Sequence, residues 1–336
     1  MSQPTKIVLG GCLHWIGRGG GGQGSYGVLF RLKPGKYFSS IKFGSKEAAL
    51  RAAEHYWRTM SAELGLTKIV PIPMIQLGVP IPDAVIQYAG GFMDGDGSIG
   101  IYTSPGGRRA RATINFTQSS ASGEPEVFRF LRFFYGGNIY VVDRSVHNSA
   151  HRAGYTMHLP SDCIEPFARQ VLSRCVIKPP QLQLLLDYLA GSVCETVAVE
   201  QSKRLHAEYG DQVDLARDRI TPAYTAGIFD AEGCVMLREG CLQVCITQKC
   251  PDFLRAVQSV HGGSVRSDAS EIRFFGPTAV SLLRAVEPHL HVKKAQVQLA
   301  LAYVDQYPPK KGTKRSVEQM EDCGVATASI KQLKRC

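Results

Sequence analysis

Apolar residues occupy every second position in two stretches of the chain: Ala112, Ile114 and Phe116 in the first, and Leu242, Val244 and Ile246 in the second. Polar residues and one cysteine fill the positions between them. Because successive side chains of a β-strand point to opposite faces, each stretch predicts a strand with one apolar face. We therefore expect antiparallel sheets with helices packed against the apolar face and a polar face left open.

A helix is predicted just before each of these strands. Each helix begins at a residue that can cap a helix N-terminus, Asp83 in the first and Thr221 in the second. Each ends at a glycine, Gly97 or Gly233, which favours a left-handed C-cap. After each strand the apolar spacing predicts a further helix, over 127–135 and 252–260.

The two regions are copies of one another. The segment YAGGFMDGDGSI from Tyr88 reappears as YTAGIFDAEGCV from Tyr224, 136 residues later. Three more pairs of blocks recur in the same order: INFTQ and VCITQ, FLRFFYGGNIY and FLRAVQSVHGGSVR, and IKPPQLQLLLDY and VKKAQVQLALAY. Four matching blocks in one order indicate an internal duplication.

The small residues of the repeated motif indicate a close contact between its two helices. They are Gly90, Gly91, Ala226 and Gly227. Glycine inside a helix costs up to about 1 kcal/mol relative to alanine, so its presence indicates that something packs closely there. If the two motif helices pack side by side, their C-terminal ends meet.

Each of those ends carries one acid, Asp96 or Glu232. A carboxylate at a helix C-terminus opposes the macrodipole, and a second carboxylate nearby adds repulsion. A divalent cation would remove both penalties, and oxygen ligands without imidazole suit Mg²⁺. An Asp-x-Asp-Gly motif that occurs only once is more often a turn or a cap.

The motifs GGFMDGDG and AGIFDAEG resemble the paired signature of the LAGLIDADG homing endonucleases, in their two-motif single-chain form. The resemblance covers roughly residues 80–305, with Ala89 and Thr225 in place of the first leucine and Gly90 where alanine is usual. It implies an α+β fold in which two αββαββα half-domains, related by a pseudo-twofold axis, form a DNA-binding saddle. It also implies that the protein is a monomer.

The same resemblance implies a site-specific, Mg²⁺-dependent DNA endonuclease that makes double-strand breaks at a long asymmetric target, for mobility of its own intron. It assigns the catalytic acids to Asp96 and Glu232, and metal contacts to the backbone carbonyls of Gly95 and Ala231. Four further residues would surround the active-site waters: Gln118, Gln248, Lys178 and Lys293. We expect Asp94 and Asp230 to be structural instead. Two alternatives stay open: an RNA maturase that assists group I intron splicing by binding its host intron RNA, and a DNA-binding protein without cleavage.

The polar sheet faces and adjoining loops supply candidate contacts to double-stranded DNA. Arginine, asparagine and glutamine can read base edges from strands in the major groove, and Arg108 and Arg109 beside a Gly-Gly turn suit phosphates. The two faces differ in sequence, which predicts a non-palindromic target. The candidates are Arg108, Arg109, Arg111, Thr113, Asn115, Thr117, Tyr140, Arg238, Gln243, Thr247, Arg266 and Arg273.

Composition and sequence blocks divide the rest of the chain. Residues 1–24 read as a flexible glycine-rich segment, and 25–72 as a small α+β module that resembles an AP2-type DNA-binding domain; an accessory domain without DNA contact is the alternative. The half-domains span 80–190 and 221–308. Residues 191–220 are a polar linker of partly helical pattern, and 309–336 a basic tail that ends in a short helix.

Charge and cysteine usage agree with an intracellular nucleic-acid partner. The chain has 39 Lys and Arg against 29 Asp and Glu, a net charge of +10, which favours a polyanion. No apolar run approaches the roughly 18 residues of a membrane span, and the N-terminus lacks the pattern of a signal peptide. The ten cysteines follow no framework spacing, so free thiols in a reducing compartment are expected, and Cys241, Cys245 and Cys250 lack the spacing of a zinc site.

Overall fold

The structure, a computed structural model, describes residues 12–17, 24–30, 33–39, 48, 51–52, 73–76, 78, 80–103, 109–120, 123–142, 154–208, 217–238, 240–308 and 316–333. The chain divides into two compact units. The first comprises Met1–Pro80 with Phe133–Gly136, and the second comprises Ile81–Arg132 with Gly137–Cys336.

The first unit contains a three-stranded antiparallel sheet in the order β1-β2-β3, formed by β1 (Cys12–Gly17), β2 (Gly24–Phe30) and β3 (Lys33–Ser39). Within the segment 1–24 that the sequence predicts to be flexible, Cys12–Gly17 pairs residue by residue with β2. The backbone is helical at Ala48, Arg51 and Ala52. An AP2-like role for this region stays a prediction.

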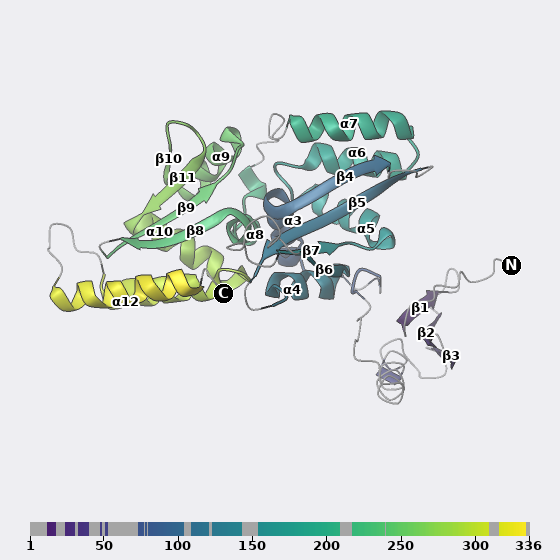
Figure 1. The fold of residues 1–336 in the computed structure, drawn as a ribbon, viewed down its shortest axis with the longest axis horizontal. Coiled ribbons are helices and arrows are strands. Elements are labelled where there is room, and N and C mark those ends of the chain that lie inside the picture. Colours follow the sequence, from purple (N-terminus) through teal and green to yellow (C-terminus); the bar gives the residue numbers. More distant parts are fainter. Residues whose placement is uncertain are drawn as a thin grey trace. The chain divides into compact units, whose positions relative to one another are not determined.

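The second unit is built from two halves with the same order of elements (Figure 1). The first half runs α3 (Asp83–Asp96), β4 (Gly97–Thr103), β5 (Ala110–Ser119), α4 (Glu126–Tyr135), β6 (Asn138–Val142), β7 (Gly154–His158), α5 (Ser161–Leu172), α6 (Pro179–Leu189) and α7 (Glu195–Ala207). The second runs α8 (Pro222–Glu232), β8 (Gly233–Arg238), β9 (Cys241–Thr247), α9 (Pro251–His261), β10 (Ser264–Val265), β11 (Glu271–Phe275), α10 (Gly276–Val286), α11 (Lys294–Gln306) and α12 (Val317–Leu333). Short 3₁₀ turns at Arg217–Arg219 and Glu287–His289 precede α8 and α11.

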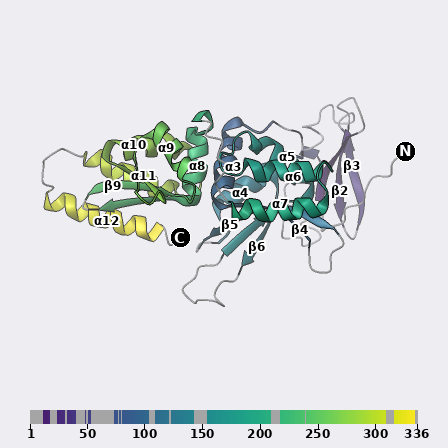
Figure 2. The same cartoon turned by 90° about the horizontal axis from the view of Figure 1, so that it is seen from above.

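The predicted α+β fold of two αββαββα halves is confirmed, since the first seven elements of each half follow that order. Both sheets are antiparallel, with the orders β4-β5-β7-β6 and β8-β9-β11-β10. Figure 2 shows α3, α5 and α6 over one face of the first sheet, which leaves the opposite face open. Among the described residues, no helix is both long and apolar enough to cross a membrane.

The predicted alternation along the central strands is also observed. Ile114 and Phe116 of β5 are buried beneath the helices, as are Val244 and Ile246 of β9. Their neighbours Thr113, Asn115 and Gln243 are only half-buried on the open face. Hydrophobic burial on one side of each strand therefore sets which side chains face outward.

The glycines after the motif helices do not adopt the left-handed conformation expected for them. Gly97 and Gly233 have φ values of −79° and −80° and extended ψ values, because the helix passes directly into a strand at each. A Cβ at Gly97 would lie 2.6 Å from the carbonyl oxygen of Met93, and one at Gly233 would lie 2.5 Å from that of Phe229. Glycine is needed at both positions for space and not for a positive φ.

The two motif helices start differently. Thr221 caps α8 as predicted, since its side chain accepts a hydrogen bond from the Tyr224 amide at 3.2 Å. Asp83 does not cap α3, because the chain is already helical at that residue and Pro82 stands at the cap. The Asp83 carboxylate instead accepts from Arg174 at 2.7 Å.

The linker and the tail both form helices that cover the free edge of a sheet. In α7, Ser202 Oγ accepts from the Ile101 amide of edge strand β4 at 3.2 Å. In α12, Thr327 Oγ1 donates to the Leu237 carbonyl of edge strand β8 at 3.2 Å. Unpaired strand edges promote aggregation, and a covering helix satisfies them. The duplication thus extends beyond the blocks that match in sequence.

Candidate active site

The two motif helices touch backbone to backbone at their central glycines. A Cβ placed on Gly91 would lie 2.0 Å from the Tyr224 carbonyl oxygen, and one on Gly227 would lie 2.1 Å from that of Tyr88. No real side chain tolerates such distances, so α3 and α8 approach this closely only because both positions are glycine. Figures 1 and 2 both show the two helices side by side. The close contact predicted from the small residues is therefore observed.

This contact brings the two acids together, because Asp96 is the last residue of α3 and Glu232 the last of α8. At Gly95 an added Cβ would lie 2.3 Å from the Ala231 Cβ and 3.4 Å from the Glu232 Cγ. The two helix C-termini, each with its acid, thus form one centre.

Burial disfavours ionisation of both carboxyls, and repulsion from Glu232 adds to this effect at Asp96. Burial, followed by the charge of Glu232, raises the pKa of Asp96 to about 6. Burial also raises the pKa of Glu232. The ammonium groups of Lys293 and Lys178 act in the opposite sense at both acids. The two lysines therefore only partly offset the effects that raise the pKa values of the two acids.

The two predicted glutamines are not equivalent in the structure. Gln118 Nε2 donates a hydrogen bond to Asp96 Oδ2, which places this amide in the centre. Gln248 is buried and its Oε1 accepts from the Lys249 amide at 2.8 Å. Its Nε2 has no hydrogen-bond partner among the described residues. The repeat predicted matched roles, but only Gln118 contacts an acid.

Both predicted lysines reach the ends of the motif helices. Lys178 Nζ donates to the carbonyls of Met93 at 2.6 Å, Gly97 at 2.7 Å and Gly95 at 3.2 Å. Lys293 Nζ makes two equivalent contacts in the second half, to Phe229 at 3.0 Å and Ala231 at 3.4 Å, and its third contact is to the Asp230 carbonyl. A cation at a helix C-terminus is favourable for the macrodipole and for the unpaired carbonyls.

Neither lysine is freely solvated, since Lys178 is buried and Lys293 is half-buried. Burial lowers the pKa of both Lys178 and Lys293, and nearby acids act against that shift. Each ammonium is held beside the carboxylates by carbonyls of its own half. The arrangement fits a fixed positive charge close to the acid pair.

The other acid of each motif is structural, as predicted. Asp94 accepts from the amides of Val176, Ile177 and Lys178 at 2.6, 3.0 and 2.9 Å. Asp230 accepts in the same way from His291, Val292 and Lys293 at 2.7, 3.0 and 2.8 Å. Each aspartate thereby fixes the start of the helix, α6 or α11, that presents the lysine.

Sequence reasoning missed two tyrosines that join the halves. Tyr224 OH of the second half donates to Asp94 of the first at 2.8 Å, and Tyr88 OH donates to Asp230 at 2.8 Å. All four side chains are fully buried or nearly so. The recurrence of Tyr88 and Tyr224 in the repeat was visible in the sequence, but their partners were not. Each half therefore helps to fix the lysine of the other.

The donor set suits a hard divalent cation. Among the described residues no three His, Cys, Asp or Glu side chains gather around a possible metal. The available oxygen donors are the Asp96 and Glu232 carboxylates and the Gly95 and Ala231 carbonyls. These two carbonyls accept the longest hydrogen bonds from the lysines, at 3.2 and 3.4 Å. Oxygen ligands of this kind fit Mg²⁺ or Ca²⁺ and leave coordination positions for substrate or water.

The open sheet faces carry most of the predicted DNA contacts. Arg109, Arg111, Tyr140, Arg238, Thr247 and Arg266 are exposed, and Thr113, Asn115, Thr117, Gln243 and Arg273 are half-buried. Two of the arginines already have acidic partners: Arg266 pairs with Asp268 at 3.1 Å and Arg273 with Glu271. Arg108 lies outside the described residues.

Three cysteines of the second half make contacts within the protein. Cys234 and Cys245 lie opposite each other on β8 and β9, and a hydrogen bond to Cys234, together with burial, raises the pKa of the Cys245 thiol. Cys250 is buried, and its sulfur accepts from the Phe253 amide at 3.4 Å. These thiols therefore contribute to the packing of this half.

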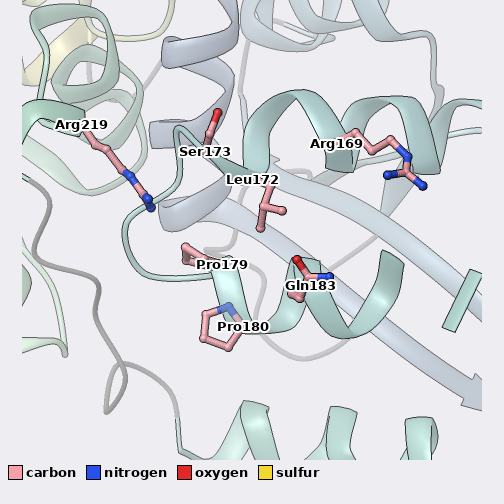
Figure 3. A pocket seen from close by; sticks show the side chains of 7 residues that line it. All are labelled: Arg169, Leu172, Ser173, Pro179, Pro180, Gln183 and Arg219. Carbon is pink, nitrogen blue, oxygen red and sulfur yellow. The ribbon is translucent and has the colours of Figure 1, made fainter. Parts of the chain in front are cut away.

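A cavity of about 510 Å³ lies elsewhere in the first half, where α5 ends and α6 begins (Figure 3). It is lined by Arg169, Leu172, Ser173, Pro179, Pro180, Gln183 and Arg219. None of these residues belongs to the acid pair or to the open sheet face. The acid pair therefore remains the candidate site.

Comparison with known proteins supports the fold. No protein-family model and no curated protein sequence matches the chain. Among solved structures, the chain is similar to I-SmaMI bound to an uncleaved DNA target with calcium ions, at 12% identity and a TM-score of 0.51, over 75% of this chain and 99% of that one. It is also similar to the LAGLIDADG homing endonuclease I-GzeII in complex with its DNA target, at 9% identity and a TM-score of 0.52, over 74% and 97%. The protein therefore has the fold of the single-chain LAGLIDADG homing endonucleases.

Proposed function

We propose that this protein is a metal-dependent DNA endonuclease that cuts both strands of a long, asymmetric target. The observation that carries the proposal is the pair Asp96 and Glu232, which lie half-buried at the adjoining C-terminal ends of two touching helices. Two lysines flank the pair, and two open antiparallel sheets extend from it. Both similar structures named above hold DNA, and one holds calcium.

The residues divide the work of phosphodiester hydrolysis. Asp96 and Glu232, with the Gly95 and Ala231 carbonyls, would hold Mg²⁺, which when bound would supply Lewis-acid stabilisation and an activated water. Lys178 and Lys293 would stabilise charge that develops on the phosphates. Gln118, through its hydrogen bond to Asp96 Oδ2, would orient that carboxylate. Because both acid positions are filled, both strands would be cut.

The sheets would hold the duplex. Strand ribbons fit the major groove, where arginine, glutamine and asparagine read base edges. The exposed Arg109 and Arg238 suit phosphates or guanines. The two outward faces differ in composition, so the half-sites would differ as well. Mobility of a host intron is part of the proposal, in line with the homing role in the name of I-GzeII's family.

The test is cleavage of a randomised duplex library with Mg²⁺, which tests activity and yields the target together. Asp96→Asn and Glu232→Gln should each abolish double-strand cleavage while binding changes little. Glu200→Gln, which neutralises an exposed carboxylate on α7, is the matched control and should cut normally. If both site variants cut at the wild-type rate, the proposal is wrong. Splicing of a host intron with and without the protein would test the alternative maturase role.

A further inference from the structure

The outward face of the second sheet carries an unusual row of apolar side chains. In the strand register, Met236 of β8 lies opposite Gln243 of β9, which lies opposite Phe275 of β11. Phe275 is 51% exposed, and Met236 is half-buried. The neighbouring row begins with Cys234 and Cys245, which are paired across the same strands. A thioether, a phenyl ring and two thiols thus occupy a face that sequence alternation predicts to be polar.

The equivalent face of the first sheet is chemically different. Its register places hydroxyl, amide, guanidinium and imidazole groups outward, and among its described positions only Val142 carries a purely hydrocarbon side chain. The outward positions there are Ser98, Gly100, Tyr102, Arg111, Thr113, Asn115, Thr117, Ser119, Asn138, Tyr140, Val142, Gly154, Thr156 and His158. This half can read bases through hydrogen bonds.

Two of the three arginines on or beside the second sheet are less available for that task, whereas Arg238 is exposed. Arg273 lies between Ser264 and Cys245 in the register, but its guanidinium is held by Glu271. Arg266 is held by Asp268 at 3.1 Å. A guanidinium already engaged by a carboxylate is a poor bidentate donor to guanine. Base recognition in this half therefore depends more on apolar contact.

Only thymine presents a methyl group in the major groove, and apolar side chains such as phenylalanine read it. We propose that the second half-domain recognises thymine 5-methyl groups through Met236 and Phe275, whereas the first half reads hydrogen-bonding edges. This inference rests on the proposed DNA-binding function and makes Met236 and Phe275 specificity residues of one half-site. Neither residue belongs to the catalytic centre.

The strand geometry also predicts where in the target these thymines lie. Met236 follows Glu232 by four residues along the chain, and a strand rises about 3.3 Å per residue. The row is thus about 13 Å from the acid, which corresponds to about four base pairs at about 3.4 Å each. Thymines should therefore be selected about four base pairs from the cut, in one half-site only.

The experiment starts from a duplex selected by binding without divalent metal, in which each thymine is replaced in turn by deoxyuridine. Deoxyuridine removes only the 5-methyl group. Loss of one buried methyl should weaken binding about fourfold in the Met236–Phe275 half-site and leave the other half-site unaffected. Dissociation constants at one fixed salt concentration measure this.

Variants connect the effect to the residues. Met236→Gln is nearly isosteric, and Phe275→Asn places a good cap before α10, so both should fold. Each should bind the thymine and deoxyuridine duplexes equally well. Met320→Gln, at an exposed methionine of α12 away from the sheet face, is the matched control and should keep the wild-type fourfold preference.

The possible failures are separable. A protein that binds the selected duplex but never cuts it with Mg²⁺ refutes the proposed endonuclease function and leaves methyl recognition intact. A protein that cuts, but binds thymine and deoxyuridine equally in both half-sites, overturns the inference alone. An unchanged thymine preference in both Met236→Gln and Phe275→Asn also overturns it.

Discussion

Asp96→Asn should stabilise the metal-free protein at neutral pH, although it removes a catalytic acid. Burial and the neighbouring Glu232 raise the pKa of Asp96 from 3.8 to about 6. A raised carboxyl pKa means that the folded state holds a proton which the unfolded chain has already released. The contribution of Asp96 to folding is therefore fully present below about pH 4 and is lost as pH rises through about 6.

The size of the effect follows from the same shift. A difference of about two pKa units corresponds to about 3 kcal/mol. Asparagine resembles the protonated acid and can still accept the hydrogen bond from Gln118. At pH 8 the free energy of unfolding of the variant should therefore be about 3 kcal/mol larger than that of wild type. At pH 4 the two free energies of unfolding should be nearly equal.

Urea unfolding in EDTA at pH 4 and pH 8 measures the difference directly. Glu200→Gln, an exposed neutralisation, is the control and should change stability by less than about 0.5 kcal/mol. Mg²⁺ added at pH 8 should stabilise wild type much more than Asp96→Asn. Repulsion from Glu232 contributes to the raised pKa of Asp96, so Asp96→Asn should stabilise the metal-free protein less in a Glu232→Gln background. A variant no more stable than wild type at pH 8 in EDTA would refute the reasoning.

Three further predictions follow from packing, buried hydrogen bonds and charge. Gly91→Ala places a methyl group 2.0 Å from a backbone oxygen and should lower the free energy of unfolding, measured in urea, by about 3 kcal/mol or more. Gly324→Ala in α12 has open space around it and should raise the free energy of unfolding by about 1 kcal/mol. Equal effects of the two variants would contradict the close contact between α3 and α8. Tyr88→Phe and Tyr224→Phe should each lower the free energy of unfolding by about 1–3 kcal/mol and lower the cleavage rate, since each leaves a buried aspartate without one donor. Single variants with unchanged stability and cleavage rate would show that the tyrosine–aspartate hydrogen bonds between the halves are dispensable. Arg109→Gln should weaken DNA binding about equally for all sequences and reduce the slope of log affinity against log salt concentration by about 0.9. Binding titrations at several salt concentrations measure this slope. A sequence-dependent loss of affinity with an unchanged slope would show that Arg109 contacts a base and not a phosphate.

Local patterns were enough to predict the elements of the fold. Alternation along β5 and β9, the capping of α8 by Thr221, and the paired glycines of α3 and α8 all follow from short-range geometry that residue types express directly. The duplication added a long-range constraint, because two copies of one motif have a natural way to pack together. From the sequence alone, that constraint also predicts that Asp96 and Glu232 meet in one centre.

Contacts between distant segments were beyond the reach of those patterns. The sequence does not state that Tyr224 donates to Asp94, or that Lys178 turns back onto the carbonyls that end α3. It predicted equal roles for Gln118 and Gln248, but only Gln118 donates to an acid, whereas Gln248 accepts from the Lys249 amide.

By itself, then, the sequence determined a duplicated α+β chain with two acids on glycine-bearing helices, since periodicity and repetition are properties of the sequence itself. Only the tertiary structure decided how the centre is held together and what its surroundings are. Crossed tyrosines, lysine-capped helix ends and helices α7 and α12 over the sheet edges all join residues that lie far apart in the chain. Such partners are selected by burial, because a polar group removed from water must find a partner among whatever groups the fold brings near it.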